Sequence, residues 1–124
     1  MSRSPMTVRP ISEAEVAVVE RALAVAATDE SAAALSSSLG ALQVIGRCKC
    51  GCASVDFRTP EPGQIAHMVA DAVAKAPNGE DLGLIIWALN GRLSGLEVYS
   101  YSDNPAPLPA VASISGYGSN TDAA

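Results

Sequence analysis

The sequence predicts an α+β domain in which two N-terminal helices pack on one face of a five-stranded antiparallel β-meander. Three observations predict this fold. Apolar residues recur at helical spacing behind a capping signal near the N-terminus. The apolar period changes to two after residue 42, as in a half-buried strand. Two Asn-Gly pairs, at 78–79 and 90–91, each separate two apolar runs, which is typical of β-hairpins.

The first predicted helix spans residues 13–27. Ser12 and Glu15 have the spacing of a capping box, in which the serine hydroxyl accepts from the glutamate amide and the glutamate side chain accepts from the serine amide. Apolar residues follow at intervals of three and four. A second, shorter helix is predicted at 30–38, because the helical spacing continues and Gly40 provides a stop.

Alternating residues predict a first hairpin around the stretch GRCKCGCASVDF, with strands at 42–48 and 53–58. In the favoured register Cys48 lies opposite Ala53. Residues 50–51 then form the turn, with a glycine at the left-handed position.

The segment IAHMVADAVAKA, residues 65–76, is ambiguous between helix and strand. Its apolar residues fit one face of a helix better than they alternate along a strand, and Pro77 would end such a helix. Periodicity alone therefore favours a helix, whereas the Asn-Gly pair that follows favours a strand.

The second predicted hairpin has strands at 82–89 and 92–101 that meet at the second Asn-Gly pair. A type I′ turn suits that pair because both central residues take a positive φ. One extra residue at 94–95 restores the alternation of apolar residues and predicts a β-bulge. Beyond the bulge, Ile85 lies opposite Glu97.

This pairing gives the second hairpin two apolar faces. A half-buried antiparallel sheet is normally polar on the face away from the core, but here that face carries three aromatic residues. The predicted core face holds Leu84, Ile86, Ala88, Leu93, Leu96 and Val98, and the second face holds Ile85, Trp87, Leu89, Glu97, Tyr99 and Tyr101.

Two interpretations of the second face remain open. In one, another element covers it, such as the segment at 105–108. In the other, its aromatic residues form an exposed patch that binds a protein partner, because tryptophan and tyrosine dominate interface hot spots. The partner-binding residues predicted on this basis are Trp87, Glu97, Tyr99 and Tyr101.

Three cysteines at alternate positions form the one cluster of possible metal ligands in the sequence. A zinc site needs three or four ligands, and the sole histidine is the only plausible fourth. The favoured register argues against zinc, because it directs Cys48 into the core and Cys52 to the other face, with Cys50 at the tip. A four-residue loop, 49–52, would let the thiols converge. Zinc bound by Cys48, Cys50, Cys52 and His67 is therefore the alternative to structural thiols with no cofactor.

Signatures of catalysis are missing from the sequence. It contains no G-x-S-x-G, no phosphate loop, no H-E-x-x-H and no Rossmann glycine set. A disulfide between cysteines two apart would be strained, and a catalytic thiol needs a base and an orienting partner. We therefore expect a protein that is not an enzyme.

The chain has 124 residues, of which 48% are hydrophobic, which suffices for one domain with its own core. We expect that domain at 11–111, after a flexible lead-in at 1–10 and before a mobile tail at 112–124. The net charge is −5, with eight basic residues scattered among thirteen acidic ones. This balance argues against nucleic acid as a partner and favours a basic protein.

The N-terminal stretch lacks the uninterrupted apolar region of a signal peptide. The first apolar stretch is interrupted by Glu20 and Arg21 and is too short to span a bilayer. We therefore expect a cytoplasmic protein that does not associate with membranes.

The stretches GRCKCGCASVDF and NGEDLGLIIWALNGRLSGLEVYSYSDNPAPLP resemble a group of small uncharacterised bacterial proteins. Those proteins have a Cys-Gly-Cys turn followed by a hairpin that ends in an L-E-V-Y-S type strand and a proline. The resemblance covers residues 46–58 and 66–109, and Cys48 departs from it. It implies a fold without an activity, and it implies that HMVADAVAKAPNGEDLGLIIW is a hairpin turning at Asn78-Gly79, against the helical periodicity.

Two functions follow as hypotheses. The first is a small non-catalytic interaction protein that binds a protein partner through the second sheet face. That partner is another protein, such as a toxin that the chain neutralises, or a second copy of the chain in a dimer. The alternative is a small zinc-binding protein that uses the cysteine hairpin.

Overall fold

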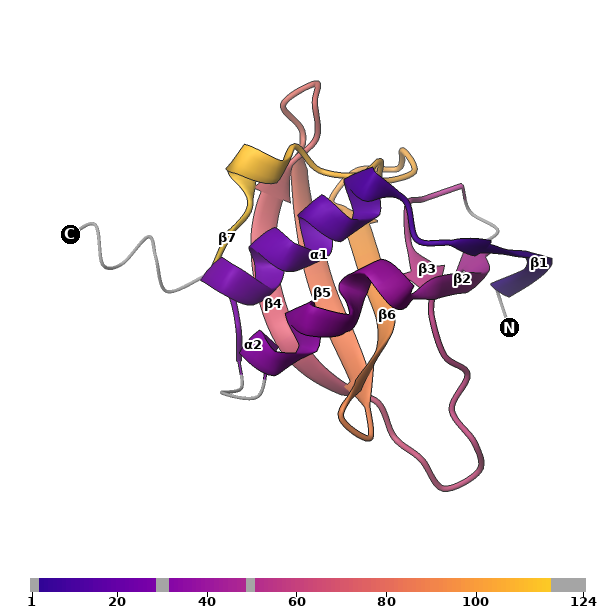
Figure 1. Cartoon of the computed structure of the whole chain (residues 1–124). Helices are drawn as coiled ribbons and strands as arrows, with labels where there is room; N and C mark the ends of the chain where they lie inside the picture. The colour runs from indigo at the N-terminus through magenta and orange to yellow at the C-terminus, as the bar shows by residue number, and fades with distance from the viewer. Residues whose placement is uncertain (1–2, 29–31, 49–50, 117–124) are drawn as a thin grey trace.

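A seven-stranded antiparallel sheet carries the helices of the chain on one side (Figure 1). The computed structural model describes residues 3–28, 32–48 and 51–116. The predicted α+β class and antiparallel sheet are confirmed. The predicted five strands and two helices are not, because the sheet has two more strands and only one α-helix in the described residues is longer than a single turn.

The five predicted strands are all present, as β2 to β6, although β3 has only two residues. They do not form a simple meander, because the sheet order is β1-β2-β3-β6-β5-β4-β7. The loop at 57–66, with two prolines and a glycine, carries the chain past β5 and β6, so that β3 pairs with β6 and not with β4. The strands are β1 Arg3–Pro10, β2 Gln43–Cys48, β3 Val55–Asp56, β4 His67–Lys75, β5 Asp81–Leu89, β6 Arg92–Ser100 and β7 Ser115–Gly116.

The two unpredicted strands form the edges of the sheet. Residues 3–10, expected as part of a flexible lead-in, form β1 and pair with β2. Within the expected tail at 112–124, β7 pairs with Ala72 and Val73 of β4. The prolines of β1 argued against a strand in the sequence. Proline is nevertheless tolerated in an edge strand, because one side of that strand needs no donor.

Helix α1, Glu13–Val25, begins at the predicted capping box. The Glu15 amide donates to Ser12 Oγ at 3.1 Å, and the Ser12 amide donates to Glu15 Oε1 at 2.9 Å. Val18, Val19, Ala22 and Leu23 form the buried side of the helix.

The second predicted helix, 30–38, is largely wrong. A single α-helical turn, α2 (Ala32–Leu35), passes directly into the 3₁₀ helix η1 (Ser36–Ala41), and residues 29–31 lie outside the described ranges. Ser37 and Ser38 donate their hydroxyls back to backbone carbonyls three residues earlier, at 3.0 and 3.2 Å, which competes with continued α-helix. None of the helices in the described ranges is long and apolar enough to cross a membrane.

The ambiguous segment at 65–76 is strand β4, so the helix that its periodicity favours is wrong and the hairpin at Asn78-Gly79 is confirmed. Gly79 takes a φ of 92°, which the turn requires. Alternate alanines of β4 face the core, and a bulge between Met68 and Ala70 shifts the register at its start.

The predicted register of the β5–β6 hairpin is confirmed. Asn90 and Gly91 take φ values of 52° and 77°, as a type I′ turn requires. The register shifts at the predicted bulge, so that Trp87 pairs with Gly95, and beyond it Ile85 pairs with Glu97. All six residues predicted for the core face are at most 2% exposed.

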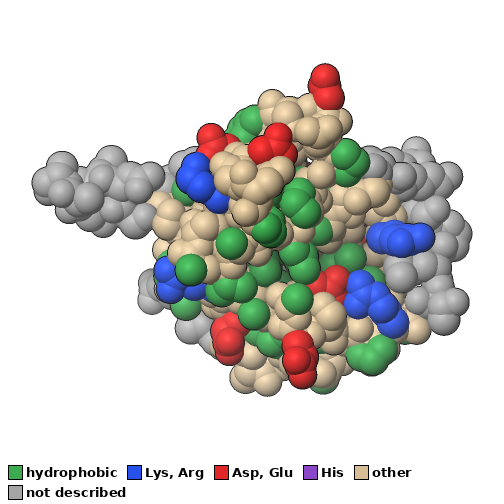
Figure 2. Space-filling model, turned by 90° about the horizontal axis from the view of Figure 1, so that it is seen from above, with side chains coloured by type: hydrophobic (Ala, Val, Ile, Leu, Met, Phe, Trp, Pro, Cys, Tyr) green, Lys and Arg blue, Asp and Glu red, His purple; other side chains and the backbone are tan. Residues whose placement is uncertain are grey.

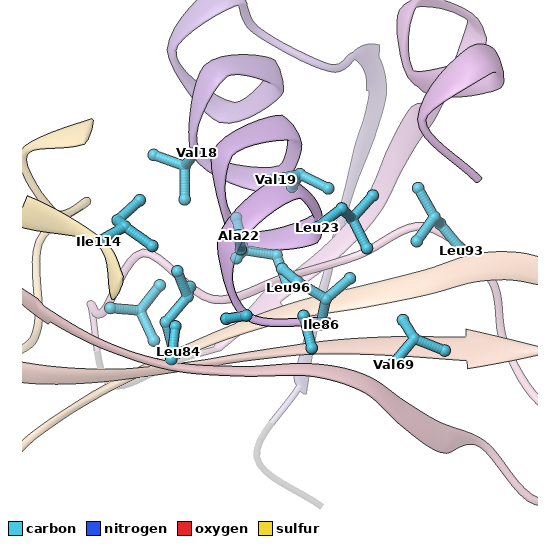
Figure 3. Close-up of a cluster of buried hydrophobic side chains, with 14 of the residues drawn as sticks. Val18, Val19, Ala22, Leu23, Val69, Leu84, Ile86, Leu93, Leu96 and Ile114 are labelled. Atoms are coloured by element: carbon cyan, nitrogen blue, oxygen red, sulfur yellow. The ribbon is translucent and has the colours of Figure 1, made fainter. Parts of the chain in front are cut away.

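The core lies between α1 and the inner face of the sheet. Figure 3 shows Val19, Ala22 and Leu23 of α1 pointing toward Leu84 and Ile86 of β5. Burial of each leucine or isoleucine side chain contributes about 1.5–3 kcal/mol. Ile114 closes the core beside Val18, and its carbonyl accepts from Arg21 Nε at 3.3 Å.

The proline-rich segment after β6 crosses one end of the sheet, at the top of Figure 1. The Ala53 amide donates to the Ala106 carbonyl at 2.8 Å, and the Ala110 amide donates to the Lys75 carbonyl at 2.9 Å. Ala106 and Leu108 join the core under α1. Figure 2 views this end and shows hydrophobic side chains across its middle, with charged side chains around them. The segment thus contributes side chains to the core at this end of the sheet.

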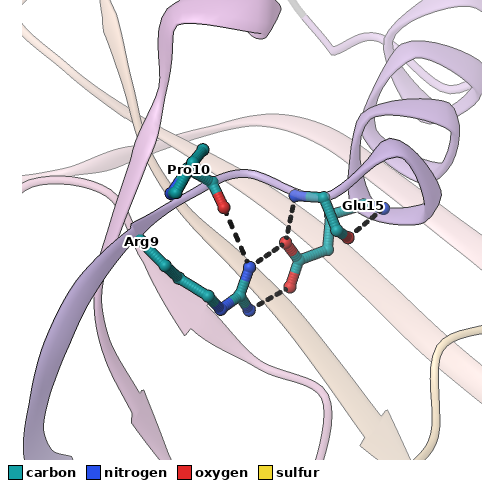
Figure 4. A network of polar contacts seen from close by, with 4 residues as sticks. Arg9, Pro10 and Glu15 are labelled. Carbon is teal, nitrogen blue, oxygen red and sulfur yellow. Dashed lines mark hydrogen bonds and ion pairs between the residues drawn. The ribbon is translucent and has the colours of Figure 1, made fainter.

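An ion pair joins β1 to the start of α1 (Figure 4). Arg9 Nη1 and Nη2 donate to the two carboxylate oxygens of Glu15 at 2.9 and 2.8 Å, and Arg9 Nη1 also donates to the Pro10 carbonyl at 3.1 Å. Burial of Glu15 disfavours its charged form, but the hydrogen bonds from Arg9 and Ser12 and the Arg9 charge outweigh burial. The pKa of Glu15 therefore lies below its ordinary value, and the hydrogen bond to Glu15 raises the pKa of Arg9.

The variant Glu15→Gln keeps an oxygen for the Ser12 amide and removes the charge that binds Arg9. Near neutral pH we expect it to be about 1 kcal/mol less stable than the wild type, since Arg9 is partly exposed and screened by water. Because the pKa of Glu15 is lower in the folded than in the unfolded chain, its charge stabilises the fold fully above the unfolded value, about 4.5. This stabilisation is lost as the pH falls through the folded pKa. Urea denaturation of both proteins from about pH 7 down to about pH 3 measures it.

Glu20→Gln is the matched control, because Glu20 lies on the exposed side of the same helix. An equal loss of stability in this control, or a difference between Glu15→Gln and wild type that is the same at all pH values, would contradict the role given to the ion pair.

Candidate functional site

The face of the sheet away from α1, here called the outer face, carries aromatic and acidic side chains. The helices α1, α2 and η1 all lie on the opposite side of the sheet (Figure 1). Cross-strand pairs across β4, β5 and β6 fix which residues share the outer face. Its central residues are Met68, Asp71, Val73, Ile85, Trp87, Glu97 and Tyr99, with Tyr101 just beyond the end of β6.

Trp87 and Glu97 are joined on this face. The indole N–H of Trp87 donates to Glu97 Oε1 at 2.9 Å. Directly opposite Trp87 lies Gly95, the bulge residue, whose missing side chain leaves room beside the indole. Both Trp87 and Glu97 are half-buried. The hydrogen bond therefore fixes the orientation of the indole and still leaves part of it open to solvent.

Tyr99 covers a glycine on the neighbouring strand. It pairs with Gly83, and a Cβ atom on Gly83 would lie 2.0 Å from Tyr99 Cζ. The ring thus occupies the space above the glycine, an arrangement in which an aromatic residue shields exposed backbone. Tyr101 packs edge-on against Tyr99, with ring centroids 5.7 Å apart, and is 65% exposed.

The predicted partner-binding residues are brought together in two contacting pairs. Trp87 bonds Glu97, and Tyr99 contacts Tyr101. Leu89, also assigned to this face, is buried. Part of the segment at 105–108 packs in the core through Ala106 and Leu108, and Pro105 and Ala106 line a cavity together with Glu97 and Tyr99 of this face.

Acidic residues lie beside the aromatic ones. Asp71 pairs with Ile85, and Ile85 pairs in turn with Glu97 on the next strand. Asp56 pairs with Gly95, and Gly95 pairs in turn with Trp87. Lys75, on the same face, forms an ion pair with Asp81 across the β4–β5 hairpin. Carboxylates therefore lie beside the apolar and aromatic side chains of the outer face, with Asp71 and Glu97 on either side of Ile85.

Backbone pairing with a further strand is hindered at both edges of the sheet. Along β4, the Thr28 amide donates to the Val69 carbonyl and the Asp71 amide to the Ala26 carbonyl, and β7 covers the next two residues. At the opposite edge, β1 carries Pro5 and Pro10, which have no N–H to offer.

A cavity of about 430 Å³ lies beside the outer face. It is lined by Cys48, Cys52 and Ser54, by residues of β6 and by residues 102–106. Cys48 and Cys52 both line it and are both half-buried. Its wall also includes the carboxylates of Glu97 and Asp103. This cavity therefore links the two regions that the sequence singled out separately.

The predicted register of the first hairpin is wrong by one residue. Gly46 pairs with Asp56, so Cys48 does not lie opposite Ala53. Strand β3 begins only at Val55, because the Ala53 amide bonds the proline-rich segment instead of β2. Cys48 is consequently not a core residue, and it faces the same cavity as Cys52, whereas the prediction directed them apart. Cys50 lies outside the described residues.

His67 does not join the cysteines. It lies on β4 and Cys48 on β2, with β3, β6 and β5 between them, which is four steps of about 4.8 Å each across the sheet. Among the described ranges, no group of three or more His, Cys, Asp or Glu side chains could hold a metal ion.

Sequence analysis missed several residues that build this region. The Ser54 hydroxyl accepts from the Val98 amide at 2.9 Å and donates to the Val98 carbonyl at 3.1 Å, which ties the cysteine loop to β6. Met68 pairs with Trp87 and extends the apolar centre. The spacing of the two hairpins could have revealed Gly83 opposite Tyr99, because the second Asn-Gly turn fixes that pair.

None of the protein-family models, curated proteins or solved structures compared with the chain matches it. The site is therefore interpreted from its own geometry.

The variant Gly83→Ala should displace the Tyr99 ring, since the added methyl group would occupy its place. We expect a loss of about 1–2 kcal/mol in unfolding free energy. In a Tyr99→Ala background the same substitution should cost much less, because the obstructing ring is gone. A double-mutant cycle by urea denaturation measures this coupling.

Gly40→Ala is the matched control, because a Cβ atom at Gly40 meets nothing within 4 Å. Gly83→Ala would contradict the packing described above if it cost as little as this control, or if its cost stayed the same without Tyr99.

Proposed function

We propose that this chain is a non-catalytic interaction protein that binds a basic protein partner through the outer face of its sheet. The observation that carries the proposal is an apolar, aromatic sheet face on the side away from the helices. Natural antiparallel sheets normally place polar residues there. Contiguous exposed apolar surface with a polar surround is typical of interaction sites.

The arrangement of Trp87 suits an anchor residue. The hydrogen bond to Glu97 holds the indole in one orientation, so the Trp87 side chain loses less conformational entropy when a partner binds it. Tyr101 adds an exposed ring beside Tyr99. Tryptophan and tyrosine with one wet edge contribute strongly to protein interfaces.

The charges on the outer face favour a basic partner. Asp56, Asp71 and Glu97 lie among its apolar side chains, and Lys75 pairs with Asp81. The whole chain also carries a net charge of −5. Complementary charge accelerates association and selects among partners more than it adds affinity.

Because both edges of the sheet are hindered, we expect a partner to bind the outer face and not to add a strand at an edge. A partner that added a strand would need unpaired donors and acceptors along an edge. The segment at 26–28 and β7 occupy one edge, and prolines interrupt the other.

The proposal is tested by affinity capture from a lysate of the source cells, followed by binding measurements with the purified partner. We expect Trp87→Ala to weaken binding by about 2 kcal/mol, roughly 30-fold in Kd. Tyr101→Ala should weaken binding without affecting the fold, since the side chain is 65% exposed. Binding should also weaken with added salt, if the partner is basic.

Glu20→Gln, on the exposed side of α1, is the control on the opposite side of the molecule. A partner that binds Trp87→Ala and Tyr101→Ala as tightly as wild type would refute the proposal. So would a concentration-dependent dimer that Tyr101→Ala dissociates, because the occupant of the face would then be a second copy of the chain.

A further inference from the structure

Two cysteines, Cys48 and Cys52, line the same cavity. Cys48 ends β2, and Cys52 lies four residues further along the chain, and both line the cavity beside β6. Their surroundings are polar as well as apolar, since Ser54, Glu97 and Tyr99 also line it. Two sulfur atoms in one half-buried cavity form a donor set for a thiophilic ion.

Both ends of the segment from Cys48 to Cys52 are anchored. Cys48 pairs with Arg3 of β1. Next to Cys52, the Ala53 amide donates to the Ala106 carbonyl at 2.8 Å, and the Ser54 side chain bonds both backbone groups of Val98. The two thiols therefore extend from backbone positions that the rest of the fold holds, which lowers the cost of ordering them around an ion.

The donor set decides which ion fits. Zinc in proteins takes three or four protein ligands, whereas Cys48 and Cys52 supply two. Soft thiolate ligands select Cu(I), which is satisfied by two thiolates. Two acidic residues, Glu97 and Asp103, also line the cavity, and nearby negative charge favours a cation.

We propose that Cys48 and Cys52 bind one Cu(I) ion in this cavity. Both thiols lose their protons to solvent, and two Cu–S bonds form. The copper stays in the +1 state throughout, so no oxidant or reductant takes part in the step. Because two protons leave, binding tightens as the pH rises. Copper binding does not require the proposed protein partner, although Glu97 and Tyr99 belong to both the cavity and the outer face.

The test uses the full chain with Cys50→Ser, which leaves Cys48 and Cys52 as its only cysteines. The probe is Cu(I), supplied under anaerobic conditions and measured in competition with a chromogenic Cu(I) chelator. We expect about one Cu(I) per chain. Adding Cys48→Ser or Cys52→Ser should weaken binding by more than about 100-fold, because even residues that only support a ligand change metal affinity by about 10–100-fold.

X-ray absorption at the copper edge provides a second measurement that needs no further variant. Two sulfur neighbours to copper in the Cys50→Ser protein would support the site, and nitrogen or oxygen neighbours alone would refute it. His67→Ala is the matched control and should bind as the parent does, because His67 lies on β4, four strands away from Cys48 on β2. The proposal fails if the Cys50→Ser protein takes up no stoichiometric Cu(I), or if it prefers Zn(II) in direct competition.

Discussion

The register of the β5–β6 hairpin is the constraint on which the rest of the structure depends. Asn90 and Gly91 set it, because few other residue pairs adopt positive φ at both positions of a tight turn. A slip of one residue would exchange the two faces of both strands. Leucine and isoleucine would then leave the core, and Trp87 would enter it. The bulge at Gly95 keeps the apolar residues of β6 on the core face over the part of the strand farther from the turn.

Residues with local, strong preferences were predictable from the sequence. The capping box at Ser12 and the Asn-Gly turns each define their own geometry within four residues, so α1 and the β4–β5–β6 hairpins could be placed. The aromatic face followed from the same register. Its openness could not be predicted, because that depends on where the segment at 105–108 goes, and only the hydrogen bonds at Ala106 and Ala110 determine its path.

The misplaced elements depend on partners distant in sequence. Strand β1 has an irregular pattern and exists because β2 pairs with it. The short β3 begins only after Ala53, whose amide bonds a segment more than fifty residues later. The alanines of β4 favour a helix by intrinsic propensity, but alanine is small enough to fill a core position of a strand as well. Tertiary context decides in each of these cases.

The first and last described strands, β1 and β7, lie at opposite edges of the sheet, six strand spacings apart. A force applied between the two ends of the folded part would therefore act across the strands and along the hydrogen bonds that join them. Under such a load the bonds at each edge would break one after another, starting with the two residues of β7, and the strands would peel away without sharing the force. The same protein would resist stretching along its strands much better, so its mechanical strength depends on the direction of pulling.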